Sequence, residues 1–255
     1  MTIAGTPRQS LREGLATPDA KRRYVRQLFH TIAGRYDLIT VLLSFGRDRS
    51  WKRRLVSLAS IGPGSRVLDL ACGTGDIAFE AATRGAHVVG LDITERMVRL
   101  AGKKGDSHTF RRSEPGKCDC PTFLVGDMMA LPFADGAFDV VTTGYGIRNV
   151  PLLEPALREI ARVLRPGGTL LSLDFNRPDP AILRVVYLAY LELAGSMLGW
   201  ALHRDPDTYR YIPASIRRYP GAPRVATLMR ENGFALAEWI PVLGGLMAIH
   251  RARRT

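Results

Sequence analysis

A ten-residue stretch, Val67 to Asp76 (VLDLACGTGD), joins an apolar strand-like run to a glycine-rich turn at Gly73 and Gly75. The residues that follow the turn predict a helix over 76–84. A strand, a glycine turn and a helix N-terminus together direct backbone N–H groups and the positive end of the helix dipole at one place. The stretch therefore predicts a ligand-binding site at the carboxyl end of a strand.

Acidic residues distinguish the two classes of ligand that use such a turn. A dinucleotide needs GxGxxG or GxGxxA and an acidic residue about 20 positions later, and Gly73 to Ala78 with Asp92 meet that spacing. At the strand end, however, the carboxylate of Asp69 would repel a pyrophosphate. S-adenosylmethionine instead offers a sulfonium, an ammonium and a ribose diol. Asp69 is predicted to face its cationic methionine part and Asp92 its ribose hydroxyls; a tight turn with incidental acids is the alternative.

The composition predicts one cytoplasmic α/β domain. The chain has 255 residues, 46% of them hydrophobic, which is enough for one sizeable core. The first 35 residues lack the apolar run of a signal peptide, and three cysteines do not make a secreted disulfide framework. The formal charge of +12 is compatible with a solvated surface, an anionic membrane at the inner face of the cytoplasmic membrane, or nucleic acid.

Strand and helix patterns alternate from Arg66 onward. The predicted strands are 66–70, 87–91, 122–125, 138–143, 169–175, 234–240 and 246–251. The predicted helices are near 76–84, 94–102, 153–164 and 222–232. This alternation predicts a Rossmann-like α/β fold, with a seven-stranded, mostly parallel sheet, helices on both faces, and an antiparallel hairpin of the last two strands at one edge.

Additions on either side of this core complete a single domain over 19–255. Residues 1–18 are predicted to be poorly ordered. Residues 19–62 form a helical cap, whose first helix is expected over 19–35 with Asp19 as N-cap. Residues 176–220 are an insertion with an apolar first half, 181–200. A lid over a hydrophobic pocket that partly touches a membrane is favoured over a transmembrane span, because charged residues interrupt the segment. An ordinary buried helix is the alternative.

The charged segment from Lys103 to Pro121 is expected to be a surface loop. Cys118 and Cys120, with His108 nearby, raise the possibility of zinc. Structural zinc sites use four ligands at recognisable spacings, and this arrangement does not match them. We therefore expect no metal.

Further motifs accompany the glycine turn. They are YD (36–37), LSFG (43–46), WKR (51–53), ALPF (130–133), FDVVTTGYGIRNV (138–150), REIARVLRPGG (158–168), LDFNRP (173–178) and DTYRYIPASIR (207–217). From about Phe29 to Arg251 the chain resembles the class I S-adenosylmethionine-dependent methyltransferases, and within them the quinone-biosynthesis C-methyltransferases. The motifs GIRNV and TYRYIPASIR narrow the resemblance to the quinone-biosynthesis enzymes, because the general methyltransferase fold requires neither motif.

The resemblance implies a set of cofactor contacts. Besides the glycine turn they are Thr74, Asp92 with the adjacent Ile93, Asp127 and Met128 along the adenine, and Gly144. The family pattern usually has Asn-Ala at 127–128, often Ser at 144, and His at the position of Asp48. These departures fall around the cofactor and the expected acceptor, so they bear on which acceptor is used.

The resemblance also implies C-methylation of a lipophilic prenylated quinol, with demethylmenaquinol as the expected acceptor. Arg148 is predicted to stabilise phenolate-like charge, Asn149 to orient the acceptor, and Tyr145 to pack against the cofactor or acceptor. A general base is not assigned; its candidates by location are His203, Asp174, Tyr209 and Tyr211.

Three other functions remain as alternatives. They are methylation of another lipophilic small molecule, methylation of nucleic acid, and cofactor binding without catalysis. Nucleic acid is not expected as a partner, because the amino-methylating enzymes need an NPPY-like motif where this chain reads GYGIRN. A homodimer remains open.

Overall fold

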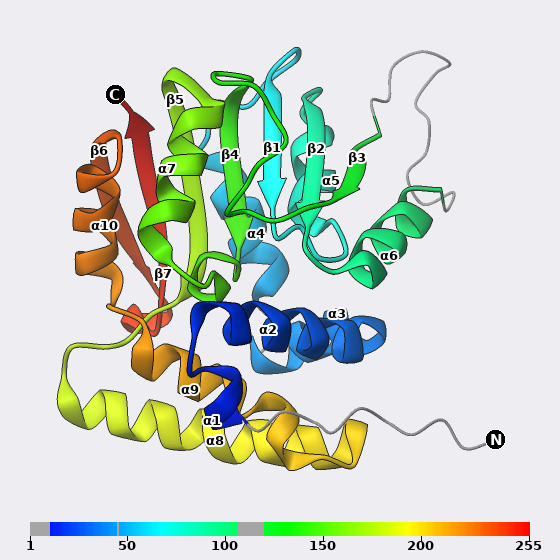
Figure 1. Cartoon of the computed structure of the whole chain (residues 1–255), viewed down its shortest axis with the longest axis vertical. Helices are drawn as coiled ribbons and strands as arrows, with labels where there is room; N and C mark the ends of the chain where they lie inside the picture. Colours follow the sequence, from blue (N-terminus) through cyan, green and yellow to red (C-terminus); the bar gives the residue numbers. More distant parts are fainter. Residues whose placement is uncertain (1–10, 45, 107–119) are drawn as a thin grey trace.

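A seven-stranded sheet forms the centre of the protein. The computed structural model describes residues 11–44, 46–106 and 120–255. The strand order is β3-β2-β1-β4-β5-β7-β6 (Figure 1). The strands are β1 (Arg66–Leu70), β2 (His87–Asp92), β3 (Thr122–Val125), β4 (Phe138–Gly144), β5 (Leu164–Phe175), β6 (Phe234–Val242) and β7 (Met247–Arg254). The predicted fold class is confirmed.

Strand directions follow the prediction, with one difference in extent. β1 to β5 pair in parallel, β7 is antiparallel to β5, and β6 pairs antiparallel with β7 at the edge. β5 begins at Leu164, five residues before the predicted start at 169. Its pairing with β4 shifts register between Phe138 and Val140, so Leu164 adds a pairing contact ahead of the regular part of the strand.

Two apolar layers cover the sheet. On one face, α4 (Asp48–Ser57) and α5 (Asp76–Ala82) pack on the side chains of Val67, Val140 and Leu171. On the other face, α7 (Leu153–Val163) and α10 (Ala222–Glu231) pack on those of Leu68, Val141 and Leu170 (Figure 1). Successive residues of a strand point to opposite faces, so β1, β4 and β5 each contribute to both layers.

Five of the ten described helices match the predicted ranges 19–35, 76–84, 94–102, 153–164 and 222–232. They are α1 (Leu11–Gly14), α2 (Pro18–Ile32), α3 (Tyr36–Leu43), α4 (Asp48–Ser57), α5 (Asp76–Ala82), α6 (Glu95–Asp106), α7 (Leu153–Val163), α8 (Ala181–His203), α9 (Tyr211–Arg218) and α10 (Ala222–Glu231). Short 3-10 turns are η1 (Ala33–Arg35), η2 (Ile147–Asn149), η3 (Pro206–Tyr209) and η4 (Leu243–Gly245).

The N-terminal helices differ from the prediction in detail. Residues 11–14, within the segment expected to be poorly ordered, form α1. The predicted N-cap of α2, Asp19, is wrong. Thr17 caps the helix, because its Oγ1 accepts a hydrogen bond from the Ala20 N–H at 3.2 Å. Pro18, which has no N–H to satisfy, then occupies the first helical turn.

The N-terminal helices α1, α2 and α3 and the insertion helices α8 and α9 lie at the carboxyl ends of the parallel strands (Figure 1). α8 packs Tyr187, Leu188 and Leu191 inward against its neighbours. Its other side is exposed and apolar; Ile182 is 83% exposed and Trp200 70% exposed. Among the described residues, α8 is the one helix long and apolar enough to cross a membrane by length and composition.

Candidate functional site

The glycine turn after β1 has the backbone shape that its residues predict. Gly73 and Gly75 adopt φ values of 55° and 87°, in the left-handed region, and Gly75 is the N-cap of α5. A Cβ atom at Gly75 would lie 2.8 Å from Phe123 Cζ. Glycine is therefore required at this position both by conformation and by the close approach of an aromatic ring.

Asp92 at the end of β2 holds this turn in place. Its Oδ2 accepts a hydrogen bond from the Gly73 N–H at 3.0 Å, and its Oδ1 accepts one from the Thr94 N–H at 2.8 Å. The side chain is buried, and this burial raises the pKa of the carboxyl above its ordinary value. Each carboxylate oxygen can accept a further hydrogen bond, so Asp92 is able to receive hydroxyl donors from a ligand.

A cavity at the carboxyl edge of the sheet collects most of the predicted site residues. Its wall includes Gly73, Asp92, Ile93, Asp127, Met128, Gly144, Tyr145 and Asn149. These residues come from the ends of β1, β2 and β4 and from the loop after β3, as expected for parallel strands. We call this space the cofactor cavity.

Two residues of this wall, Asp127 and Gly144, depart from the family pattern. Asp127 accepts a hydrogen bond from the Met129 N–H at 2.8 Å and forms an ion pair with Arg22 of α2 at 3.0 Å. Its carboxylate therefore closes the cavity wall against the N-terminal helix. At Gly144, a Cβ would lie 2.7 Å from the terminal Cδ1 of Ile77, so a larger residue would require the end of the Ile77 side chain to move.

Three predicted cofactor residues lie outside the cavity wall. Thr74 donates a hydrogen bond from its hydroxyl to Asp37 Oδ1 at 2.6 Å, and Gly75 starts α5. Asp69 is fully buried beneath the turn, where its Oδ1 accepts a hydrogen bond from the Thr142 hydroxyl at 2.8 Å. Its second oxygen, Oδ2, is buried without a hydrogen-bond partner among the described residues. For Thr74 and Asp69 a direct ligand contact stays a prediction.

The cavity fits S-adenosylmethionine better than a dinucleotide. Its wall carries the carboxylates of Asp92 and Asp127, and Arg22 is already paired with the second of these. A pyrophosphate there would face two carboxylates in a partly buried space. A sulfonium with an ammonium and a ribose diol matches carboxylates in both charge and hydrogen bonding. Asp92 would hold the ribose, and Gly73 would line the methionine side.

The Asp69 carboxyl predicts pH-dependent cofactor binding. Burial raises its pKa to about 7. A cationic ligand favours the ionised carboxylate, so below that pKa binding must also remove a proton, whereas above it the carboxylate is already charged. We expect affinity for S-adenosylmethionine to rise between about pH 6 and about pH 8, with proton release detected by calorimetry in two buffers. Asp69→Asn should flatten this dependence; an unchanged slope in that variant would rule out Asp69 as its source.

A second, largely apolar cavity adjoins the first. It is lined by Leu28, Phe29, Ile32, Tyr36, Ile39, Leu43, Trp51, Phe175, Ile212 and Met247, with the polar groups of Thr40, Ser44, Tyr145, Arg148, Thr208, Tyr209 and Tyr211. Phe29, Tyr36 and Tyr145 line both cavities. We call this second space the acceptor cavity. α8, the predicted lid, contributes no residue to this wall; the second half of the insertion does.

Arg148 places a fixed positive charge on the acceptor cavity. Its Nε and backbone N–H each donate to Asp174 at 3.1 Å, and its Nη1 donates to the Ser215 hydroxyl. The guanidinium also lies over the Phe175 ring, 5.4 Å from its centroid. It is 5% exposed, and although burial alone would lower its pKa, the paired Asp174 carboxylate raises it. Arg148 is therefore both the ion pair at a strand end and a charge facing the cavity.

GIRNV and TYRYIPASIR meet in space. Ser215 of the second motif bonds to Arg148 of the first, and the Tyr211 hydroxyl donates to Asn149 Oδ1 at 2.9 Å. Asn149 Nδ2 donates in turn to the Tyr145 carbonyl at 2.7 Å. Both polar ends of Asn149 are thus engaged within the protein, and Asn149 lines the cofactor cavity rather than the acceptor cavity, so its contact with the acceptor stays a prediction. The two motifs are therefore in direct contact through their side chains.

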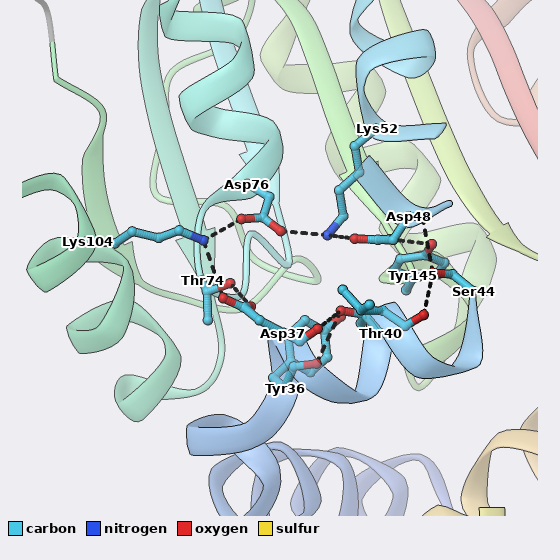
Figure 2. Close-up of polar contacts among 11 residues, drawn as sticks. Tyr36, Asp37, Thr40, Ser44, Asp48, Lys52, Thr74, Asp76, Lys104 and Tyr145 are labelled. Carbon is cyan, nitrogen blue, oxygen red and sulfur yellow. Dashed lines mark hydrogen bonds and ion pairs between the residues drawn. The ribbon is translucent and has the colours of Figure 1, made fainter. Parts of the chain in front are cut away.

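A chain of polar contacts behind the site was missed at the sequence level. It runs from the Tyr145 hydroxyl through Asp48, Lys52, Asp76, Lys104 and Asp37 to the Thr74 hydroxyl (Figure 2). The WKR and YD motifs contained Lys52 and Asp37, but nothing in their spacing showed that they converge. Tyr36, which lines both cavities, was also missed in the YD motif.

The candidates for a general base already form hydrogen bonds with other groups of the protein. Asp174 accepts hydrogen bonds from Arg148 and from the Phe175 N–H at 2.8 Å. His203 shares a 2.9 Å hydrogen bond with the Tyr209 hydroxyl. Of the zinc candidates, His108 and Cys118 lie outside the described residues. His250 is buried in β7 and His87 begins β2, so both are strand residues as predicted.

Comparison with known proteins agrees with this geometry. A family model described as the ubiE/COQ5 methyltransferase family matches residues 17–254. A ubiquinone/menaquinone biosynthesis C-methyltransferase UbiE of Azotobacter vinelandii is 37% identical, over 91% of this chain and 90% of that protein. A demethylmenaquinone methyltransferase of Mycolicibacterium paratuberculosis is 38% identical, over 92% of this chain and 96% of that protein.

Solved structures show the same fold at low sequence identity. A methyltransferase of Thermotoga maritima, described as a possible histamine N-methyltransferase, has a TM-score of 0.62 at 18% identity, covering 91% of this chain and 100% of that one. An S-adenosylmethionine-dependent methyltransferase of Aquifex aeolicus has a TM-score of 0.56 at 14% identity, covering 80% and 89%.

Proposed function

Because the chain belongs to the ubiE/COQ5 methyltransferase family, we propose that it transfers a methyl group from S-adenosylmethionine to a ring carbon of a prenylated quinol, with demethylmenaquinol as the acceptor. The observation that carries this proposal is the pair of adjoining cavities. One has the carboxylate-lined wall that suits the cofactor, and the other is apolar and carries one buried arginine. A hydrophobic aromatic ring with an ionisable hydroxyl suits the second space.

Methyl transfer requires the protein to position the two reactants and to stabilise the charge that develops on the acceptor. When bound, S-adenosylmethionine supplies an electrophilic methyl group on a sulfonium that leaves as a neutral thioether. Asp92 accepts hydrogen bonds from a diol and so fixes the ligand along the strand ends. Arg148, held rigid by Asp174 and Ser215, provides positive charge where negative charge develops on the acceptor oxygen. The rings of Phe29 and Tyr36 line both cavities and give the region where they meet a largely apolar wall.

Methyl transfer from labelled S-adenosylmethionine tests the proposal. Purified protein is incubated anaerobically with reduced demethylmenaquinol and, separately, with its prenylated benzoquinol counterpart. Label in the naphthoquinol product supports the proposal. If label appears only in the benzoquinol product, quinol C-methylation is still supported, and the acceptor is the prenylated benzoquinol instead of demethylmenaquinol. No label in either quinol, with cofactor binding intact by calorimetry, rejects the quinol proposal in favour of another lipophilic acceptor.

The exposed face of α8 supports a further proposal, that the protein associates with an anionic membrane at the inner face of the cytoplasmic membrane. Its outward side chains are Ile182, Val185, Val186, Leu193, Met197 and Trp200, each more than 60% exposed. The formal charge of the chain is +12, which complements anionic lipid. A prenylated acceptor resides in the membrane, so a surface-bound enzyme would reach it directly.

Substitution on this face predicts weaker binding to vesicles. Trp200→Glu should lower binding to vesicles containing anionic lipid by about tenfold or more, because a buried large apolar side chain contributes about 1.5–3 kcal/mol. Leu236→Glu, at a residue 67% exposed on the edge strand β6, should bind like the wild type. Equal binding of all three proteins would contradict α8 as the membrane-binding face.

A further inference from the structure

Tyr145 stands where the two cavities meet. Its backbone has φ 59°, the left-handed region that a tyrosine rarely adopts, and its N–H donates to the Leu173 carbonyl at 2.7 Å. Its ring packs on Phe175, with centroids 5.5 Å apart. The uncommon backbone conformation turns the side chain toward α4, and the side chain lines both cavities.

A buried carboxylate lies directly behind the phenol. Asp48 is 2% exposed, and its Oδ1 accepts the Tyr145 hydroxyl hydrogen bond at 2.8 Å (Figure 2). Its Oδ2 is 2.6 Å from Lys52 Nζ, and Lys52 also holds Asp76 at 2.9 Å. The Asp48 N–H donates to the Ser44 hydroxyl at 3.1 Å. Besides the phenol, two contacts thus hold Asp48: Lys52 at its carboxylate and the Ser44 hydroxyl at its backbone N–H.

This arrangement determines what the phenol offers to a ligand. Because the Tyr145 hydroxyl donates its proton to Asp48, its oxygen presents lone pairs as a hydrogen-bond acceptor. Charged or titratable groups acting on it are Asp48 and Lys52 of α4, Tyr36 of α3 and Asp174 of β5. Burial and the adjacent Asp48 raise the pKa of Tyr145 well above its ordinary value. The phenol therefore stays protonated and needs the carboxylate to take up a proton.

Resting on the proposed function, we propose that Tyr145 and Asp48 form the general base for the acceptor hydroxyl. The acceptor O–H bond breaks as its proton moves to Tyr145 Oη, and the phenol proton passes to Asp48 Oδ1. The electron pair stays on the acceptor oxygen, which makes the ring carbon more nucleophilic. Asp48 becomes neutral while Lys52 keeps its pairing with Asp76. Tyr145 is the catalytic residue, and Asp48 acts through it as a positioning residue.

The other candidates lack this arrangement. The Asp174 oxygens are occupied by Arg148 and a backbone N–H. The Tyr209 hydroxyl bonds to His203, and the Tyr211 hydroxyl donates to Asn149. Where the family resemblance has histidine, this chain places Asp48, whose carboxylate accepts the Tyr145 hydroxyl hydrogen bond at 2.8 Å.

The test compares pH profiles of Tyr145→Phe and Asp48→Asn with wild type, using reduced demethylmenaquinol. Removal of a general base is expected to lower kcat about 100-fold at pH 7. Between about pH 7 and about pH 9 the variants should recover as the quinol ionises by itself, whereas the wild type changes little. Asp48→His should retain activity at high pH and lose it below about pH 6.5, where the imidazole is protonated. Tyr219→Phe is the matched control, because that buried hydroxyl has no hydrogen-bond partner among the described residues.

A second readout is independent of turnover. 4-Nitro-1-naphthol changes colour on ionisation, and its apparent pKa when bound should be about one unit higher in wild type than in Tyr145→Phe, because Tyr145 Oη accepts a hydrogen bond from the neutral naphthol hydroxyl. Variants that lose kcat by the same factor at every pH, or a Tyr145→Phe enzyme within threefold of wild type, would overturn the assignment. Absence of methyl transfer by the wild type would instead reject the proposed function, and the naphthol titration would still decide whether Tyr145 accepts the hydrogen bond of a phenolic hydroxyl; equal bound pKa values in wild type and Tyr145→Phe would overturn that contact.

Discussion

Arg148→Ala is expected to lower kcat about 100- to 1,000-fold and also to destabilise the protein by about 3–5 kcal/mol. The catalytic loss follows from removing the one positive charge that lines the acceptor cavity within the described residues. The loss of stability follows from Asp174, which is 1% exposed and would keep a buried charge without its partner. Urea unfolding and steady-state kinetics with the quinol measure the two effects separately.

A second substitution separates these effects. Arg148→Ala combined with Asp174→Asn removes the unpaired carboxylate charge, so we expect stability to recover in part while kcat stays low. Arg224→Ala is the matched control, because Arg224 forms a half-exposed ion pair with Glu231 on α10, and such pairs contribute little. Full recovery of kcat in the double variant would show that Arg148 acts only by neutralising Asp174.

Asp92→Ala is expected to weaken S-adenosylmethionine binding by about 100-fold or more. Two hydrogen bonds from a diol to a carboxylate would be lost, each worth about 1.5–3 kcal/mol. In addition, the Gly73 and Thr94 N–H groups would lose their acceptor, so the glycine turn would be less firmly held. Isothermal titration calorimetry measures the affinity, and circular dichroism shows whether the fold is kept.

The loss of affinity for S-adenosylmethionine should depend on how many hydrogen-bond acceptors remain at position 92. Asp92→Asn keeps the side-chain shape and one acceptor, so we expect a smaller loss than with alanine. Asp139→Ala is the control. Asp139 lies in β4, away from both cavities, and its carboxylate pairs with Arg66 and Arg165, so this variant should leave the affinity unchanged. Wild-type affinity in Asp92→Ala would exclude the ribose as its ligand group.

The sequence predicted what depends on local chemistry. Alternating apolar residues placed the strands, and the order of Gly73, Gly75 and Asp92 located the turn, because a left-handed backbone and a helix N-terminus have local signatures. The family resemblance supplied Asp127, Met128 and Asn149, and the structure places them on one cavity wall, since parallel strands end at one edge.

What the sequence did not predict depends on contacts between distant segments. Asp48 reaches the Tyr145 hydroxyl across 97 positions, and Lys52 reaches Asp76 across 24. No periodicity encodes such a pair. The apolar run 181–200 was equally ambiguous, because composition does not say which side of a helix packs inward; Gly195 and Gly199 face the protein, while Trp200 points outward. The early start of β5 arises from a register shift that only the paired strand reveals.

The contact of Arg148 with Ser215, and of Asn149 with Tyr211, means that the insertion between β5 and α10 is not an exchangeable module. The segment that closes the acceptor cavity also sets the hydrogen bonding of the arginine that faces it. Grafting the corresponding segment of a relative to change the acceptor would alter the arginine at the same time, unless positions 211 and 215 are retained. In this chain, the same segment therefore affects both which acceptor fits the cavity and how Arg148 is held beside it.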